Sequence, residues 1–359
     1  MTYSKWMFCA AALVAAVTLT AAENGNEKGG NLETGPYDVV DWPHHLDTKY
    51  GWGRTPAVEV ESDSRIYIAQ SNELEIADRK MGNNHLPMYD AVVQKNVRKD
   101  NLIVVVDSEG KLVESWKQHN HLWTNIHRVR LNPLDTERPV WIVDQGIHQA
   151  IKFSRDGKQT LLTIGEYKKA GNDETHITSP TDISFAPNGD IFIAEGNGHV
   201  AKFSKDGKFI LRWGKTGKGP GEFGTGSTPH GITVDAKRNR VFLADRDNSR
   251  VLIFDLNGKY IEEWPGIRGP EFIGISADDS IWVVDGHANK ILQFDATGHL
   301  QSGWGTFGGH EGQFWGIHHL SVDSKGNLYT AEVYGGRAQK FVPKKGANQK
   351  LLVKPFRKF

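Results

Sequence analysis

Short stretches in which apolar and polar residues alternate follow one another along nearly the whole chain after residue 36. In the clearest unit, four such stretches lie between turns rich in Gly, Asn and Asp, at residues 181–185, 190–194, 199–203 and 208–214. Alternation with a period of two, interrupted by these turn residues, predicts one sheet of four antiparallel strands.

The four-strand unit recurs along the chain. Complete units are indicated at residues 56–116, 127–164, 230–264 and 273–305. A last unit, at 318–342, has only three strands, and the alternating segment at 38–42 can supply the fourth. Repeats of roughly 40–50 residues are typical of propeller blades. We therefore predict an all-β, six-bladed β-propeller whose last blade is closed by the N-terminal strand, which leaves no sheet edge open.

The first residues are typical of an export signal. Lys5 precedes an apolar run over residues 6–19, and small residues at 20–22 offer a cleavage site. The run is too short and too rich in alanine for a permanent transmembrane helix, and the only cysteine, Cys9, lies within it. We expect an exported protein, periplasmic or extracellular, without disulfides. The predicted segments are a signal peptide at 1–22, a disordered linker at 23–36, the propeller at 37–345 and a basic tail at 346–359.

Charge argues against one class of partner. The sequence holds 43 basic and 43 acidic residues, a formal net charge of zero, so it lacks the positive surface typical of a nucleic-acid binder. Basic residues gather only in the C-terminal tail, where we expect a solvated terminus. We expect a monomer that contacts neither nucleic acid nor, after signal removal, a membrane, and that takes a small molecule or a peptide as substrate.

Histidines recur at the start of alternate innermost strands. Aligning these strands predicts one equivalent position per blade, occupied in order by Pro56, His127, Thr181, His230, Ile273 and His318. Innermost strands start at one rim of the central channel, so the three imidazoles are expected to converge on the axis. Three histidines with an open fourth position match a catalytic zinc site, which acidifies a bound water. Copper, iron or manganese would also accept these ligands.

Two other interpretations of the histidines stay open. Each could simply be packed beside the channel or hydrogen-bonded to water. His319, adjacent to His318, is a rival ligand, although the blade register favours His318.

One local motif resembles a known repeat. The segment at 244–251, with a weaker echo at 285–291, is similar to the signature of NHL repeats. This resemblance covers nearly all of the mature chain and implies an NHL-type propeller. It says little about function, because propellers host enzymes and scaffolds alike.

Over the same region the sequence resembles the peptidyl-α-hydroxyglycine α-amidating lyases. The matching runs are residues 126–127, 144–149, 180–183, 208–214, 221–223, 229–230, 244–250 and 317–318. The resemblance implies that His127, His230 and His318 hold zinc. It also implies a reaction in which the metal and an ionised tyrosine handle the hydroxyl of a carbinolamide. The C–N bond then breaks to give an amide and glyoxylate, with an arginine assisting.

The chain departs from this family at several positions. The family's tyrosine follows a turn in blade three that here is residues 195–198 and contains none. Its arginine follows the second strand of blade one, where this chain has Ala69 and Gln70. His319 replaces an aspartate that helps hold a structural calcium, so a structural calcium is doubtful. The family's disulfides are also absent.

Three residues are candidates for the missing catalytic groups. Arg246 matches the family motif in the turn after the second strand of blade four, and Tyr334 occupies the corresponding turn of blade six. Arg79 belongs to an insertion in blade one, residues 71–101, that could cover the channel mouth as a lid. Other side chains expected in this lid are Asp78, Lys80, His85 and Tyr89. The alternatives are a structural ion pair for Arg246 and ordinary loop positions for the others.

Three hypotheses for function follow. The leading one is an exported, metal-dependent lyase or related hydrolase in which Arg246 anchors an anionic group, with amidating-lyase activity as its most concrete form. The second is a non-catalytic NHL propeller that binds a protein or glycan partner on one face. The third is a calcium-dependent lactonase-type propeller, which the three imidazoles disfavour because calcium prefers oxygen ligands.

Overall fold

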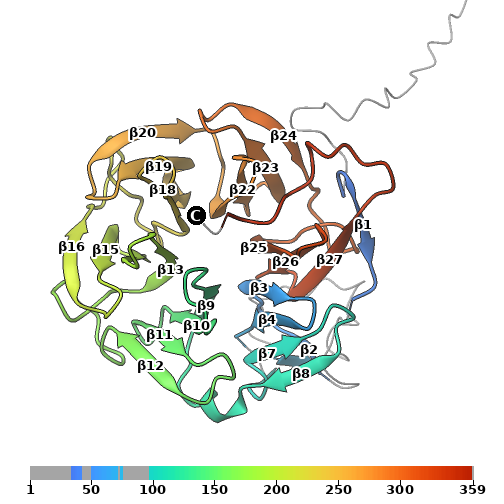
Figure 1. Cartoon of the computed structure of the whole chain (residues 1–359), viewed down its shortest axis with the longest axis horizontal. Helices are drawn as coiled ribbons and strands as arrows, with labels where there is room; N and C mark the ends of the chain where they lie inside the picture. The colour runs from blue at the N-terminus through green and yellow to red at the C-terminus, as the bar shows by residue number, and fades with distance from the viewer. Residues whose placement is uncertain (1–33, 43–49, 72, 76–96, 358–359) are drawn as a thin grey trace, which may run out of the picture.

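The structure, a computed structural model, describes residues 34–42, 50–71, 73–75 and 97–357. In this part of the chain six four-stranded sheets stand in a ring around a central channel (Figure 1). The predicted all-β, six-bladed β-propeller is confirmed. The expected signal peptide and most of the expected linker lie outside the described residues. Among the described helices, none has the length and apolar character needed to cross a membrane.

The first three blades are antiparallel meanders in chain order. Blade one consists of β3 (Ala57–Ser62), β4 (Arg65–Ala69), β7 (Ile103–Val106) and β8 (Leu112–Ser115). Blade two consists of β9 (Ile126–Leu131), β10 (Val140–Asp144), β11 (Gln149–Phe153) and β12 (Thr160–Ile164). Blade three consists of β13 (Pro180–Phe185), β14 (Ile191–Glu195), β15 (His199–Phe203) and β16 (Phe209–Trp213).

Blades four and five repeat this arrangement. Blade four consists of β17 (Ile232–Asp235), β18 (Arg240–Asp245), β19 (Arg250–Asp255) and β20 (Tyr260–Pro265). Blade five consists of β21 (Pro270–Ile275), β22 (Ile281–Asp285), β23 (Lys290–Phe294) and β24 (Leu300–Trp304). The first strand of each blade contacts the first strands of both neighbouring blades, so β3, β9, β13, β17, β21 and β25 form the wall of the channel.

The sixth blade joins the two ends of the chain. Its strands are β25 (Ile317–Val322), β26 (Leu328–Glu332), β27 (Arg337–Pro343) and, outermost, β1 (Tyr37–Val40). The N-terminal strand β1 runs antiparallel to β27, with Tyr37 opposite Pro343. The predicted closure by the N-terminal strand is therefore confirmed, and it covers the edge that β27 would otherwise expose.

Tryptophans link neighbouring blades near their outer strands. In four places a turn glycine with positive φ lies against a tryptophan of the preceding blade, and a Cβ added to the glycine would lie only 2.4 to 2.6 Å from the indole. The pairs are Trp116–Gly157, Trp213–Gly258, Trp264–Gly298 and Trp304–Gly35. Each position requires glycine for two reasons: the positive φ, and the space beside the backbone that the indole fills.

A small sheet lies outside the six blades. It consists of β2 (Tyr50–Trp52), β5 (Glu73–Glu75) and β6 (Val97–Arg98), in the order β2-β5-β6. The two ends of the blade-one insertion thus pair with each other, and β5 also pairs with the segment before blade one. Residues 76–96 lie outside the described part of the chain. The proposed lid residues Asp78, Arg79, Lys80, His85 and Tyr89 all fall in that range. Among the described residues, two short 3₁₀ helices, η3 (Lys117–His119) and η4 (Arg246–Asn248), connect strands elsewhere.

The C-terminal segment folds back onto the propeller. Leu352 and Val353 are buried in the core of blades five and six, and the Val353 amide donates to the Tyr37 hydroxyl at 2.8 Å. The Phe356 ring packs on Phe272, with ring centroids 5.6 Å apart. The expectation of a solvated terminus is wrong for these residues, because their apolar side chains cover core that the blades leave open.

Candidate metal centre

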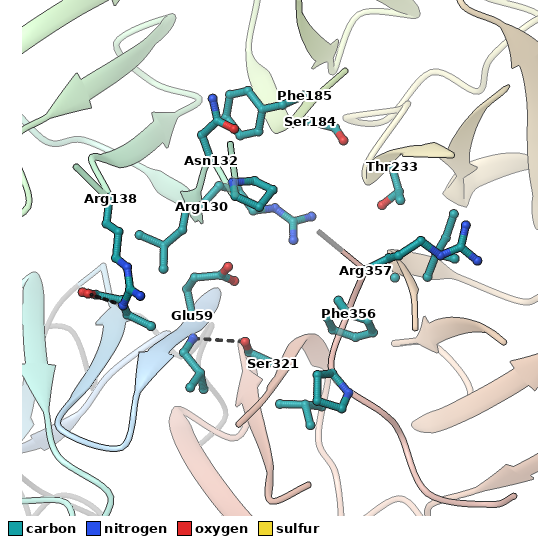
Figure 2. A pocket seen from close by; sticks show the side chains of 18 of the residues that line it. Glu59, Arg130, Asn132, Arg138, Ser184, Phe185, Thr233, Ser321, Phe356 and Arg357 are labelled. Atoms are coloured by element: carbon teal, nitrogen blue, oxygen red, sulfur yellow. Dashed lines mark hydrogen bonds and ion pairs between the residues drawn. The ribbon is translucent and has the colours of Figure 1, made fainter. Parts of the chain in front are cut away.

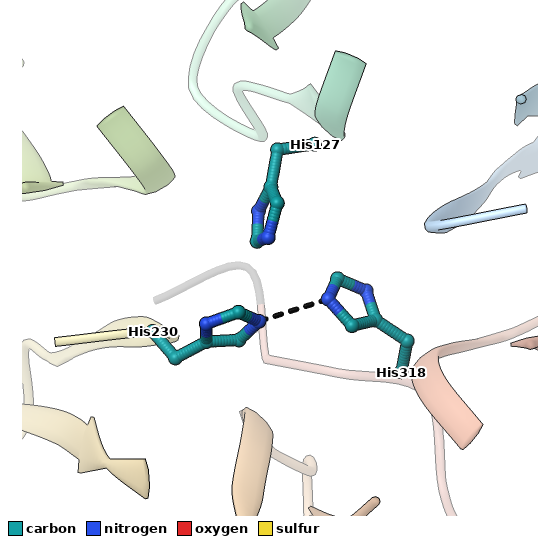
Figure 3. A group of neighbouring side chains, drawn as sticks. All are labelled: His127, His230 and His318. Atoms are coloured by element: carbon teal, nitrogen blue, oxygen red, sulfur yellow. Dashed lines mark hydrogen bonds between the residues drawn. The ribbon is translucent and has the colours of Figure 1, made fainter. Parts of the chain in front are cut away.

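The three histidines of alternate blades each lie at a bulge at the start of an innermost strand or just before such a strand. In blade two, Ile126 pairs with Asp144 and Arg128 with Val143, which leaves His127 without a cross-strand partner. His318 is left unpaired in the same way in blade six, and in blade four His230 lies two residues before β17. A bulge redirects the side chain of the extra residue, and here all three imidazoles turn toward the channel axis (Figure 3).

The three imidazoles form one compact, buried group. His127, His230 and His318 are 1–2% exposed, and their ring centroids lie 4.6 to 5.0 Å apart. One nitrogen from each ring lies within 4.8 Å of the others, so that the three could hold a metal ion between them.

Main-chain carbonyls determine which nitrogen faces the centre. The Nδ1 atoms of His127, His230 and His318 lie 2.5, 3.0 and 2.7 Å from carbonyl oxygens of Thr181, Ser227 and Pro56. A carbonyl oxygen can only accept, so each Nδ1 carries the proton and each Nε2 keeps its lone pair. Metal-binding histidines are held by the same kind of outer hydrogen bond.

Arg128 is a second neighbour of the His318 ring. Its Nη1 lies 2.8 Å from His318 Nδ1, but it also has the carbonyl oxygens of Pro56 and His318 at 3.3 Å. We assign the Nδ1 proton to the bond with the Pro56 carbonyl, since the guanidinium can donate to either carbonyl instead.

The surroundings keep the imidazoles neutral. Burial lowers the pKa of His127 and His318 well below the ordinary value, and nearby positive groups including Arg128 lower it further. Burial also lowers the pKa of His230, although the Glu271 carboxylate opposes this shift. Neutral imidazole is the form that binds a metal, so the site needs no proton release from these rings before binding.

Blade five contributes Glu271 to the axis. In its register Glu271 is the residue left unpaired between Pro270 and Phe272, as His127 and His318 are in their blades. The predicted equivalence of Ile273 is therefore wrong by two residues. The sequence signal that identifies the correct residue is a proline, because Pro270 precedes Glu271 as Pro229 precedes His230.

Glu271 touches the histidine group directly. Its Oε2 lies 2.6 Å from His230 Nε2, 3.8 Å from His318 Nε2 and 3.5 Å from Arg246 Nη1. Burial alone would raise the pKa of this carboxyl, but His230, Arg246 and Arg128 outweigh it and lower the pKa to about 2. Glu271 is therefore a carboxylate at neutral pH.

Arg246 lies beside this group, and Tyr334 lies near Arg246. Arg246 follows β18 in η4, with its side chain 21% exposed and its Nη2 donating to the Gly226 carbonyl. The tyrosine is close enough for its hydroxyl to affect the pKa of Arg246. The repeat's own ion pairs use other arginines, Arg250 with Asp245 and Arg337 with Glu332. Arg246 itself pairs both with Glu271 on the axis and with the neighbouring Asp247, at 3.5 and 3.3 Å.

Below the histidines the channel is filled by charge and aromatic rings. The buried Arg128 guanidinium also donates to the Glu271 carbonyl at 2.5 Å. His319 is fully buried, with Nδ1 at 2.8 Å from the Val58 carbonyl and its ring against Phe272. The group of three nitrogens that could hold a metal includes His318 and leaves His319 out.

The opposite mouth of the channel opens into a cavity of about 1040 Å³ (Figure 2). The far ends of the innermost strands line it, together with Phe356 and Arg357 of the C-terminal segment. Its polar groups include Glu59 and Arg130, and Arg130 forms a two-point ion pair with Asp182 at 2.9 and 2.6 Å. The histidine group is not part of its lining.

Comparison with known proteins agrees with the fold and with the family resemblance. A family model described as a 6-bladed beta-propeller matches residues 170–265. A peptidyl-alpha-hydroxyglycine alpha-amidating lyase 2 from Drosophila melanogaster is 28% identical over 310 residues, which cover 83% of this chain and 72% of the relative. Human NHL repeat-containing protein 3 is 27% identical over 333 residues, covering 85% and 83%.

A third relative is much longer than this chain. The mouse peptidyl-glycine alpha-amidating monooxygenase is 29% identical over 171 residues, which cover 45% of this chain and only 17% of the mouse protein. Taken with the geometry, these relationships show that the chain is a six-bladed β-propeller resembling the amidating lyases and NHL repeat proteins, with three buried histidines that could hold a metal ion.

Proposed function

We propose that this protein is an exported, metal-dependent lyase that cleaves the C–N bond of peptidyl-α-hydroxyglycines to give a peptide amide and glyoxylate. The observation that carries the proposal is the set of three buried Nε2 lone pairs, from His127, His230 and His318, held toward one point by carbonyl-bound Nδ1 atoms. The relative named peptidyl-alpha-hydroxyglycine alpha-amidating lyase 2, similar over 83% of the chain, supports this choice of reaction.

The donor set suits zinc or a neighbouring first-row metal, because neutral imidazole is a good ligand for these ions. When bound, the metal would supply Lewis acidity toward an oxygen of the substrate. We propose zinc as the resident ion.

The reaction requires two proton movements that side chains of this protein would handle. The substrate hydroxyl loses its proton as the carbonyl of glyoxylate forms, and the amide nitrogen gains one as the C–N bond breaks. Tyr334, close to Arg246 on the rim of the site, would move these protons. The partly exposed Arg246 guanidinium would bind the substrate carboxylate, a pairing strengthened by charge-assisted hydrogen bonds. Arg79, in the insertion, remains a further candidate for this role.

The proposal is tested with the purified mature protein and a double variant, His127→Ala/His230→Ala. We expect about one transition-metal ion per chain in the wild type, as three imidazole ligands would bind, and none in the variant. Mass spectrometry should detect glyoxylate and amide from an α-hydroxyglycine peptide with the wild type only. The mass of the mature chain also reports whether residues 1–22 are removed. A wild-type protein without metal, or turnover unaffected by the double substitution, would contradict the proposal.

A second function is favoured by one observation. The similarity to human NHL repeat-containing protein 3, whose name states no reaction, extends over 85% of this chain. The alternative is therefore a non-catalytic propeller that binds a protein or glycan on one face. Under this alternative the double variant would retain partner binding, and no amide product would form with either protein.

A further inference from the structure

Four atoms that can only accept hydrogen bonds, or act as ligands, meet at the axis without a donor among them: the three histidine Nε2 atoms, His127 included, and the Glu271 Oε2. The Nδ1 protons of His230 and His318 are engaged by the Ser227 and Pro56 carbonyls. Their Nε2 atoms, 2.8 Å apart, therefore face each other with lone pairs. The Glu271 Oε2 lies 2.6 Å from the first of them and 3.8 Å from the second. Such a group repels itself unless a cation lies among its members.

In the described part of the chain, no hydrogen bond to the Glu271 Oε2 explains its position. Its Oε2 is a buried atom without a hydrogen-bond partner, and its side chain is 8% exposed. The contact with Arg246 Nη1, at 3.5 Å, is an ion pair too long for a hydrogen bond of ordinary strength. A buried carboxylate is costly unless a donor or a metal compensates it.

The backbone places Glu271 on the axis by the same kind of bulge that places His127 and His318 there. It is the unpaired residue at the start of β21, directly after Pro270. This strand lies between β17, which follows His230, and β25, which carries His318. The charged side chain of Glu271 thus belongs to the group of side chains on the channel axis, together with the three histidines.

We propose that Glu271 is a fourth protein ligand of the metal centre, so that the site binds a divalent first-row metal through three imidazoles and one carboxylate. This rests on the proposed metal dependence and extends it. A catalytic zinc with three protein ligands keeps one tetrahedral position open. With Glu271 as a fourth ligand, a substrate would need a coordination position beyond these four or would have to displace the carboxylate. Mixed nitrogen and oxygen donors also suit manganese and iron.

The test compares the metal-free wild type with Glu271→Gln, which keeps the shape of the side chain and removes its charge. Asp247→Asn is the matched control. Asp247 and Glu271 both pair with the Arg246 guanidinium, Asp247 at 3.3 Å. Zinc and cobalt dissociation constants are measured by competition with a chromophoric chelator, and the visible spectrum of the cobalt form is recorded. Thermal unfolding of each metal-free protein verifies that it is folded.

We expect Glu271→Gln to weaken zinc and cobalt binding at least about 10- to 100-fold, since the loss of outer partners alone has effects of that size. The cobalt absorption bands should shift in Glu271→Gln and stay unchanged in Asp247→Asn. If Glu271→Gln does not fold, Glu271→His replaces one ligand by another and should bind cobalt tightly with a new spectrum.

Two outcomes would overturn the proposal, and they differ in meaning. Unchanged affinity and an unchanged cobalt spectrum in Glu271→Gln would make Glu271 an ion-pair partner only, while the three-histidine site would stand. A wild type that binds neither metal would remove the proposed function and this inference together.

Discussion

At the residue scale, the axial position of blade five shows how a sequence alignment can miss a functional side chain. Ile273 and Glu271 are two residues apart, and in a strand such residues point to the same face. A shift of two therefore leaves the apolar alternation unchanged, whereas a shift of one would reverse it. Only the proline before each position, Pro229 and Pro270, distinguishes the two alignments.

Glu59, at the opposite mouth of the channel, should make stability depend on pH. Burial raises the pKa of this carboxyl to about 7, from 4.5, against the opposing effect of Arg130. Because the folded state holds this proton more tightly, the stabilisation is fully present below pH 4.5 and is lost as the pH rises through about 7. We expect Glu59→Gln to have a melting temperature that increasingly exceeds that of the wild type between pH 5 and pH 8.

The control for this comparison is Glu137→Gln, a substitution of an exposed carboxylate in the loop between β9 and β10. Melting curves at several pH values should show parallel behaviour for the control and the wild type. Equal pH dependence in Glu59→Gln and the wild type would show that Glu59 does not titrate in this range.

At the element scale, the strand that closes the ring contributes through a few buried groups. Tyr37, the first residue of β1, is fully buried and packs on Trp304 with ring centroids 5.6 Å apart. Its hydroxyl accepts from the Val353 amide of the C-terminal segment. One side chain thus connects the N-terminal strand, blade five and the C-terminal segment.

Replacing this tyrosine should weaken the closure of the ring. We expect Tyr37→Ala to lower the free energy of unfolding by about 3–5 kcal/mol, the usual loss when a buried aromatic is truncated. Asp38→Ala, at the next and exposed position of β1, should change it little. Chemical denaturation of both variants measures the difference. Similar stability for the two would indicate that blade six holds together without β1.

At the scale of the whole molecule, Arg128 joins blades across the axis. Its guanidinium reaches main-chain carbonyls of Pro56, Glu271 and His318, which belong to blades one, five and six. Its Nε lies 3.5 Å from the Asp182 carboxylate of blade three. Burial lowers the pKa of Arg128 only to about 10, so the charge persists in the middle of the ring at neutral pH.

Removal of this charge should therefore destabilise the propeller as a unit. We expect Arg128→Met to cost about 3 kcal/mol or more, because several buried acceptors lose their donor at once. The control is Arg138→Met, because the Arg138 side chain is 53% exposed and pairs with Glu61 at 3.2 Å. Calorimetry should show one cooperative transition at a lower temperature for Arg128→Met. A melting temperature equal to that of the control would contradict a central structural role.

Local alternation and turn residues were sufficient to predict six blades, their strand boundaries within a few residues, the closure by residues near 37, and three histidines on alternate blades. These features repeat along the chain, so each unit supports the reading of the others. The tertiary structure alone decided which nitrogen of each ring faces the centre, that Glu271 joins it, and that the C-terminal segment is buried. Those properties depend on contacts between distant residues, such as Arg128 and His318, 190 positions apart. A pattern with a period of two predicts the face of the strand to which each side chain points, but not which side chain of another blade it contacts.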